Sequence, residues 1–241
     1  NGSCAMCPST GLYFLVDVSG SMTGEKFDAV RSAMAGFMDD PLSTGISVGL
    51  GYHPVPATVT GSFCVTTGMA CTADTDCGLG DRCASSTSSA SCNLVDYQTP
   101  EVAIAPFPVS EAAINNSLAA KMPGGTSSPP PGLRGALQYV KNYAVANGGK
   151  KVGIVYILDA MPIACNITPN SPNDLVAVAQ SFANGSPPVL TYVIGMGTDV
   201  SQAQINQIAA AGGTNTGYLA TTNAEVTNAL SAIRLTFRPC Q

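Results

Sequence analysis

Stretches of consecutive apolar residues alternate along this chain with stretches in which apolar residues recur every three or four positions. Residues 11–16, 152–158 and 189–194 are almost wholly apolar and rich in β-branched and aromatic side chains, which is typical of strands buried on both faces. Between them, apolar residues return at helical spacing, as at Phe27 and Val30. Strands that alternate with helices form a mostly parallel sheet covered on both faces. The sequence therefore predicts a doubly wound α/β fold.

The same pattern predicts the individual elements. Two further strands are expected at residues 46–52 and 217–220. Helices are expected around six sets of apolar positions, at residues 27–38, 113–118, 133–144, 175–182, 205–208 and 226–233. Gly148 and Gly149 should end the third of these helices, because glycine adopts the backbone conformations that stop a helix.

Residues 53–99 break the pattern. They contain five of the nine cysteines and a polar low-complexity run at residues 85–91. Nine cysteines with a single histidine argue against zinc and for disulfides. A segment of this size cannot hold a core without such bridges, so we expect an inserted, disulfide-stapled lobe. Its Asp74, Asp76 and Asp81 could hold Ca²⁺ or could belong to ordinary polar turns.

Length, charge and cysteine content limit the classes of protein to which this chain can belong. A chain of 241 residues is long enough for one sizeable core. Its net charge of -5 and its lack of a basic cluster make nucleic acid an unlikely partner. Disulfides imply export, so we expect a secreted protein at or beyond the cell surface, with any signal peptide removed or outside this sequence. No apolar run approaches the roughly 18 residues of a membrane span.

Candidate chemistry begins where the first predicted strand ends. Asp17, Ser19 and Ser21 follow residues 11–16 directly and place a carboxylate and two hydroxyls in one turn before a helix. Hard oxygen ligands of this kind suit a hard divalent cation. The alternative is a cluster of helix-capping side chains without metal, since Asp and Ser are favoured there in any case.

These three residues resemble the DxSxS motif of von Willebrand factor A (vWA) domains, the core of the metal-ion-dependent adhesion site. That family supplies two more ligands, a Thr in a loop before a middle helix and an Asp after a later strand. Thr126 and Asp159 occupy the corresponding places in the right order. The resemblance spans about residues 9–238, and it departs from the family at Ala160, where glycine is frequent.

The resemblance implies a Rossmann-like vWA fold with a mostly parallel sheet. It assigns residues 10–52 and 100–241 to the vWA domain, residues 53–99 to the cysteine-rich inserted lobe and residues 1–9 to an N-terminal linker. It also places a third strand at residues 102–107, antiparallel to the second.

By the same resemblance, Ser19, Ser21 and Thr126 would bind the cation directly, and Asp17 and Asp159 would bind it largely through waters. Mg²⁺ fits because it keeps waters readily, and Mn²⁺ or Ca²⁺ could substitute for it. Neutral hydroxyl ligands leave much of the metal charge unquenched, so a carboxylate of a partner should complete the site. The expected function is an extracellular adhesion module that binds an acidic group of a protein or other ligand.

The topology of that fold also suggests disulfide partners. The lobe should flank the metal face, and Cys165, which follows Asp159 on the same side, could pair with one of the lobe cysteines. At the opposite end, Cys240 should pair with Cys4 or Cys7.

Two other functions compete with this interpretation. One is a structural subunit of a surface assembly in which the site is vestigial. The other is a hydrolase that uses the metal or a serine, but no paired base is recognised near Ser19 or Ser21, and the single histidine, His53, is expected at the surface or in a turn. We therefore expect a protein that is not an enzyme.

Overall fold

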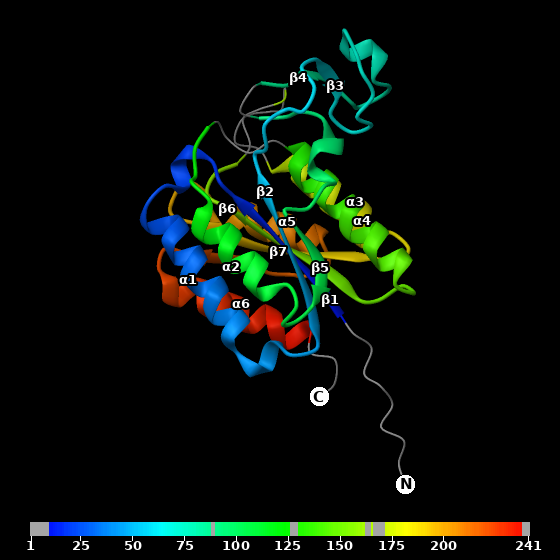
Figure 1. The fold of residues 1–241 in the computed structure, drawn as a ribbon. Coiled ribbons are helices and arrows are strands. Elements are labelled where there is room, and N and C mark those ends of the chain that lie inside the picture. The colour runs from blue at the N-terminus through cyan, green and yellow to red at the C-terminus, as the bar shows by residue number, and fades with distance from the viewer. Residues whose placement is uncertain (1–9, 88–89, 126–129, 162–164, 166–171, 238–241) are drawn as a thin grey trace.

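The structure is a computed structural model, and it describes residues 10–87, 90–125, 130–161, 165 and 172–237. Its centre is a six-stranded sheet in the order β5-β2-β1-β6-β7-β8 (Figure 1). The strands are β1 (Thr10–Asp17), β2 (Ile46–His53), β5 (Val102–Pro106), β6 (Val152–Leu158), β7 (Val189–Met196) and β8 (Tyr218–Ala220). All neighbours in this sheet are parallel except β5, which runs antiparallel to β2. The predicted α/β fold with a mostly parallel sheet is therefore confirmed.

Helices cover both faces of the sheet (Figure 1). One layer holds α1 (Glu25–Asp39), α2 (Glu111–Ala120) and α6 (Asn223–Phe237), and the other holds α3 (Pro130–Ala146), α4 (Asn173–Ala183) and α5 (Gln202–Ala211). Because side chains alternate along a strand, β1 contributes to both layers. Leu12, Phe14 and Val16 pack in the first core, and Tyr13 and Leu15 pack in the second. This double burial explains the unbroken apolar run of residues 11–16.

The expected helices and strands are all present, with small differences at their ends. Four short 3-10 turns were not predicted, η1 (Gly20–Met22), η2 (Pro41–Ser43), η3 (Asp74–Asp76) and η4 (Leu94–Tyr97). Within the part of the chain that the structure describes, none of the helices is long and apolar enough to cross a bilayer.

The segment between β2 and β5 projects beyond one end of the sheet as a lobe (Figure 1). Its only regular pairing among the described residues is the short antiparallel ribbon of β3 (Ser62–Cys64) and β4 (Cys83–Ser85). Two disulfides, Cys64–Cys77 and Cys71–Cys83, staple this ribbon. A lobe with so little secondary structure depends on these bridges for its stability.

A third disulfide joins the lobe to the main body. Cys92 bonds to Cys165, which confirms the predicted pairing of Cys165 with a lobe cysteine. The expected bond from Cys240 to Cys4 or Cys7 lies outside the described residues.

Close packing of η4 against α3 also fixes the lobe. A Cβ atom on Gly135 of α3 would lie 2.3 Å from the backbone oxygen of Leu94 and 2.6 Å from Cβ of Tyr97. Only glycine allows this approach, so the base of the lobe lies directly on the helix that begins beside the predicted site.

Candidate metal centre

The four predicted ligands that the structure describes gather where β1 and β6 end side by side. Asp17 is the last residue of β1, and Asp159 follows the last residue of β6. These strands are paired in register, with Val16 opposite Ile157. From β1 the chain turns one way to β2, while β6 and β7 extend the sheet the other way. This change of direction is the switch point at which open α/β sheets bind ligands.

Hydrogen bonds connect four of the five predicted ligands. The backbone N–H of Ser19 donates to Oδ1 of Asp17 at 2.7 Å. The hydroxyls of Ser19 and Ser21 are 3.1 Å apart, and Ser21 Oγ donates to Oδ1 of Asp159 at 2.9 Å. Asp17, Ser19 and Asp159 are almost completely buried, whereas Ser21 is exposed. The site thus combines two buried carboxylates and a buried hydroxyl with one exposed hydroxyl, that of Ser21.

These hydroxyls do not act as helix caps. Ser19 is the N-cap of η1, but its side chain makes no capping hydrogen bond. The N-cap of α1 is Gly24, which has no side chain to offer. The capping alternative therefore does not account for the serines, whose hydroxyls are directed toward each other and toward Asp159.

Thr126 lies outside the described residues, but the two residues before it dock on the serine turn. Gly124 N–H donates to the backbone oxygen of Val18 at 2.8 Å, and Gly20 N–H donates to the oxygen of Gly125 at 3.3 Å. The loop that carries Thr126 therefore reaches the turn that carries Ser19 and Ser21.

Lys26 also belongs to this site, although no motif in the sequence marks it. Its Nζ lies 2.8 Å from Oδ2 of Asp159 and 3.9 Å from Oδ2 of Asp199, and its side chain is 27% exposed. The sequence feature that could have indicated a role for Lys26 is its position, nine residues after Asp17 in the first turn of a helix that begins beside the serine turn. In the described structure, the lysine supplies positive charge to the carboxylate that a cation would also approach.

Burial raises the pKa of Asp17 to about 7. Desolvation is the main cause, hydrogen bonds from Ser19 oppose it, and the nearby negative charge of Asp159 adds to it. A buried carboxyl beside a second carboxylate would be stabilised by additional positive charge. Carboxylate and hydroxyl oxygens are the donors that Mg²⁺ binds, so the residues present fit this cation.

Comparison with solved structures identifies the architecture. One similar structure is the pilus adhesin SpaC from Lactobacillus rhamnosus GG, in its open conformation. The match covers 95% of this chain and 30% of the SpaC chain, with a TM-score of 0.58 and 13% sequence identity. A von Willebrand factor type A protein from Catenulispora acidiphila matches 94% of this chain and 42% of its own, with a TM-score of 0.54 and 17% identity. The fold is that of a vWA domain.

At these identities the likeness concerns the vWA fold itself. This chain spans less than half the length of both similar proteins. No protein-family model matches the sequence, and no curated protein matches it.

His53 lies next to the site, within the core of the vWA fold. The prediction of a surface or turn position was wrong, because β2 continues through His53 and the lobe begins only after it. Its ring is fully buried, packs on Tyr156 at 4.9 Å between centroids and has Nε2 3.1 Å from the backbone oxygen of Ile157. Burial lowers the pKa of His53 to about 3, so the imidazole is neutral at physiological pH.

The lobe carboxylates are used for local structure. Oδ1 of Asp74 accepts from Cys83 N–H, Oδ2 of Asp76 accepts from the backbone of Thr72, and Asp81 accepts from the backbone N–H groups of Thr66, Thr67 and Arg82. Among the described residues, the one close group of potential metal ligands consists of Cys64, Cys71 and Cys77, all of which form disulfides. The polar-turn interpretation of the lobe therefore accounts for these side chains.

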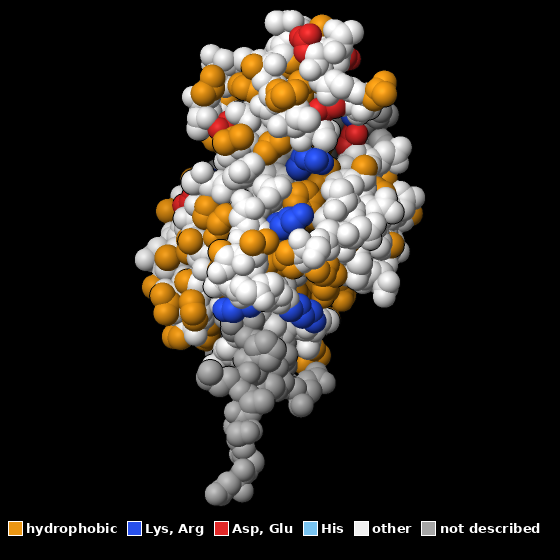
Figure 2. Space-filling model, turned by 90° about the vertical axis from the view of Figure 1, so that its right-hand side faces the viewer, with side chains coloured by type: hydrophobic (Ala, Val, Ile, Leu, Met, Phe, Trp, Pro, Cys, Tyr) orange, Lys and Arg blue, Asp and Glu red, His pale blue; other side chains and the backbone are white. Residues whose placement is uncertain are grey.

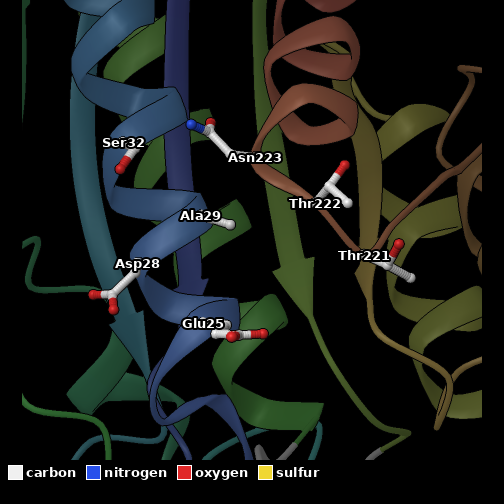
Figure 3. Close-up of a pocket in the computed structure, with 7 residues that line it drawn as sticks. All are labelled: Glu25, Asp28, Ala29, Ser32, Thr221, Thr222 and Asn223. Carbon is white, nitrogen blue, oxygen red and sulfur yellow. The ribbon is translucent and has the colours of Figure 1, made fainter.

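A groove of about 350 Å³ separates α1 from the start of α6 (Figure 3). It is lined by Glu25 and Asp28 on α1 and by Thr221, Thr222 and Asn223 on the other side. Among the described residues, none of the predicted metal ligands lines it. The groove is therefore separate from the candidate metal centre.

Proposed function

We propose that this chain is an extracellular binding module that recognises an acidic group of a protein or other ligand through a divalent cation, with Mg²⁺ the best fit. The observation that carries the proposal is the hydrogen-bonded set of Asp17, Ser19, Ser21 and Asp159 at the switch point of the sheet. Hydroxyls that do not cap a helix and that face buried carboxylates have the arrangement of a site for a hard cation.

Each residue has a separate role in this proposal. Ser19, Ser21 and Thr126 supply neutral oxygens to the cation, and Asp17 and Asp159 hold waters around it. The bound cation supplies an open coordination position and unquenched positive charge for a ligand carboxylate. The protein positions the oxygens through the Ser19 N–H bond to Asp17 and the Ser21 bond to Asp159.

Lys26 is expected to give up part of its contact with Asp159 when the site is filled. Its ammonium lies 2.8 Å from Asp159 and is partly exposed, so it can move toward solvent and Asp199. In the metal-free protein it compensates the carboxylate charge, which keeps the turn in its shape.

The three disulfides among the described residues support a location outside the cell, where such bonds persist. One of the solved structures with this fold is described as a pilus adhesin, and we propose a related role in adhesion for this chain. The ring of His53 is held in the core and is not placed as a solvent-accessible base.

A structural subunit with a vestigial site is the competing function, and metal titration separates the two. Mg²⁺ and Mn²⁺ are titrated calorimetrically into chelator-stripped wild type, Asp17→Ala and Ser21→Ala. Ser32→Ala is the matched control, because Ser32 is an exposed α1 serine outside the predicted ligand set.

Saturable one-site binding is expected in wild type and Ser32→Ala, with at least a tenfold loss of affinity in Ser21→Ala and no binding in Asp17→Ala. Circular dichroism verifies that each variant is folded. Equal heats in all four proteins would refute the metal site and favour the structural subunit.

A further inference from the structure

A second candidate binding place lies where the lobe meets the helix layer. A cavity of about 160 Å³ separates Thr66 and Gly80 of the lobe from Arg134 on α3 and from Asp174 and Ala177 on α4. In Figure 1 the lobe lies above the upper end of α3. Figure 2 shows basic side chains just beneath the lobe on this side of the molecule, with acidic ones beside them. None of the four described metal-ligand candidates, Asp17, Ser19, Ser21 and Asp159, lines this cavity.

Arg134 is the unusual residue in this cavity. Its side chain is partly buried, yet it makes no hydrogen bond or ion pair with any residue that the structure describes. The other described arginines are paired: Arg31 with Asp28, Arg82 with Asp174, and Arg234 with Asp40. A guanidinium carries five N–H donors in a planar fork, and leaving them unpaired away from water is costly.

The acidic groups nearby are already engaged. Asp174 accepts from Nη2 of Arg82 at 2.8 Å. Asp81 accepts from the backbone N–H groups of Thr66, Thr67 and Arg82. Desolvation lowers the pKa of Arg134, and the more distant charge of Asp81 offsets only part of this effect. The environment of Arg134 would therefore be improved by one more negative charge.

The cavity also has a free hydroxyl and apolar walls. The side-chain hydroxyl of Thr66 makes no hydrogen bond within the described residues, although the backbone N–H of Thr66 is bonded to Asp81. Val65, Pro130 and Val178 supply apolar surface. Such a cavity can bind a charged group that is attached to a short aliphatic chain.

We propose that this crevice binds an aliphatic carboxylate of a polypeptide partner, held by the guanidinium of Arg134 and the hydroxyl of Thr66. An arginine fork matches the two oxygens of a carboxylate. The crevice favours a singly charged group over phosphate, because Asp81 and Asp174 stand nearby and would repel a dianion more strongly. The proposal does not depend on a bound metal.

Two kinds of carboxylate could fit, that of an acidic residue and that of a polypeptide C-terminus, and small probes distinguish them. N-acetylglutamic acid α-amide carries only the carboxylate of the acidic residue, and N-acetylalanine carries only a terminal one. N-acetylglutamine amide is the neutral control and inorganic phosphate is the dianion. Each is titrated into the whole protein in the presence of EDTA while the arginine Nε–H signals are followed by NMR, so the metal centre does not contribute.

A saturable shift of the Arg134 signal is expected with one or both carboxylates, and the more effective probe identifies the source. Affinity should fall at least tenfold in Arg134→Gln and stay unchanged in Arg31→Gln, the control for loss of another partly buried arginine charge. Phosphate should bind at least tenfold more weakly than the better carboxylate.

A second variant tests the crevice without removing the arginine. Ala177→Glu, at an exposed α4 position that lines the cavity, should place a tethered carboxylate there and abolish probe binding. The proposal is overturned if no probe saturates, if the neutral amide or phosphate binds as well as the carboxylates, or if binding is unchanged in Arg134→Gln. Unchanged probe binding in Ala177→Glu would also overturn the proposal, so this variant tests it even if Arg134→Gln does not fold.

Discussion

Replacing Asp17 by asparagine should make the metal-free protein much less stable at pH 5 than at pH 7, whereas the wild type should change little. The reason is that two buried groups respond to acid in opposite directions. The pKa of His53 is lowered from 6.5 to about 3, and the pKa of Asp17 is raised from 3.8 to about 7.

The effect of His53 opposes stability in acid. Between about pH 3 and 6.5 the unfolded protein binds a proton at this imidazole and the folded protein does not, so stability is lost as the pH falls. At about 1.4 kcal/mol for each pH unit below the ordinary pKa, the loss reaches about 2 kcal/mol at pH 5.

Asp17 acts in the opposite sense. Between pH 3.8 and about 7 the folded protein holds a proton on this carboxyl that the unfolded protein releases, so stability is present at low pH and is lost as the pH rises toward 7. The gain from pH 7 to pH 5 is again about 2 kcal/mol, which offsets the loss from His53.

Urea unfolding followed by far-ultraviolet circular dichroism, in EDTA at pH 7 and pH 5, measures both effects. The free energy of unfolding should fall by about 2 kcal/mol on acidification in Asp17→Asn and rise by a similar amount in His53→Leu. Comparing the two pH values within each variant removes any constant cost of repacking. A pH dependence of Asp17→Asn that runs parallel to that of the wild type would show that Asp17 is already ionised in the fold and would refute the reasoning.

Two further predictions concern the charge at the site and the anchor of the lobe. Lys26→Met should bind Mg²⁺ about tenfold more tightly than wild type, because a unit charge about 6 Å from a dication repels it by roughly 1.4 kcal/mol in a water-like dielectric. Calorimetric titration measures the affinity, with Lys141→Met as the control, and binding equal to or weaker than that of the wild type would contradict the prediction. The double variant Cys92→Ser, Cys165→Ser removes the disulfide that joins residues separated by 73 positions in the sequence, and its unfolding free energy in urea should fall by about 4 kcal/mol. An unchanged unfolding midpoint would show that the disulfide does not constrain the unfolded protein and would contradict the prediction.

Much of the fold follows from local pattern. The apolar run of residues 11–16, rich in β-forming side chains, predicts a strand buried on both faces, and Leu12 and Tyr13 indeed face opposite cores. The helix stripe that includes Phe27 and Val30 is likewise buried as its spacing predicts. Such elements are predictable because their periodicity reflects burial directly.

The lobe was predictable only in outline. Its cysteine density indicated disulfides, but the partners depend on which segments meet in space. Cys165 could be assigned to the lobe because the order of the strands placed both at one end of the sheet. The pairs Cys64–Cys77 and Cys71–Cys83 follow no local rule, since several connectivities are compatible with the same spacing.

The sequence by itself determined the alternation of strands and helices, the position of Asp17, Ser19 and Ser21 at a strand end, and the place of Asp159 after a later strand, because these depend on residues that are neighbours in the sequence. Tertiary structure decided that Ser21 bonds to Asp159, that Lys26 joins them, that His53 is buried and that Arg134 stands without a described partner beneath the lobe. Those facts depend on contacts between distant segments and on the burial of each charge, and neither quantity can be obtained from local periodicity.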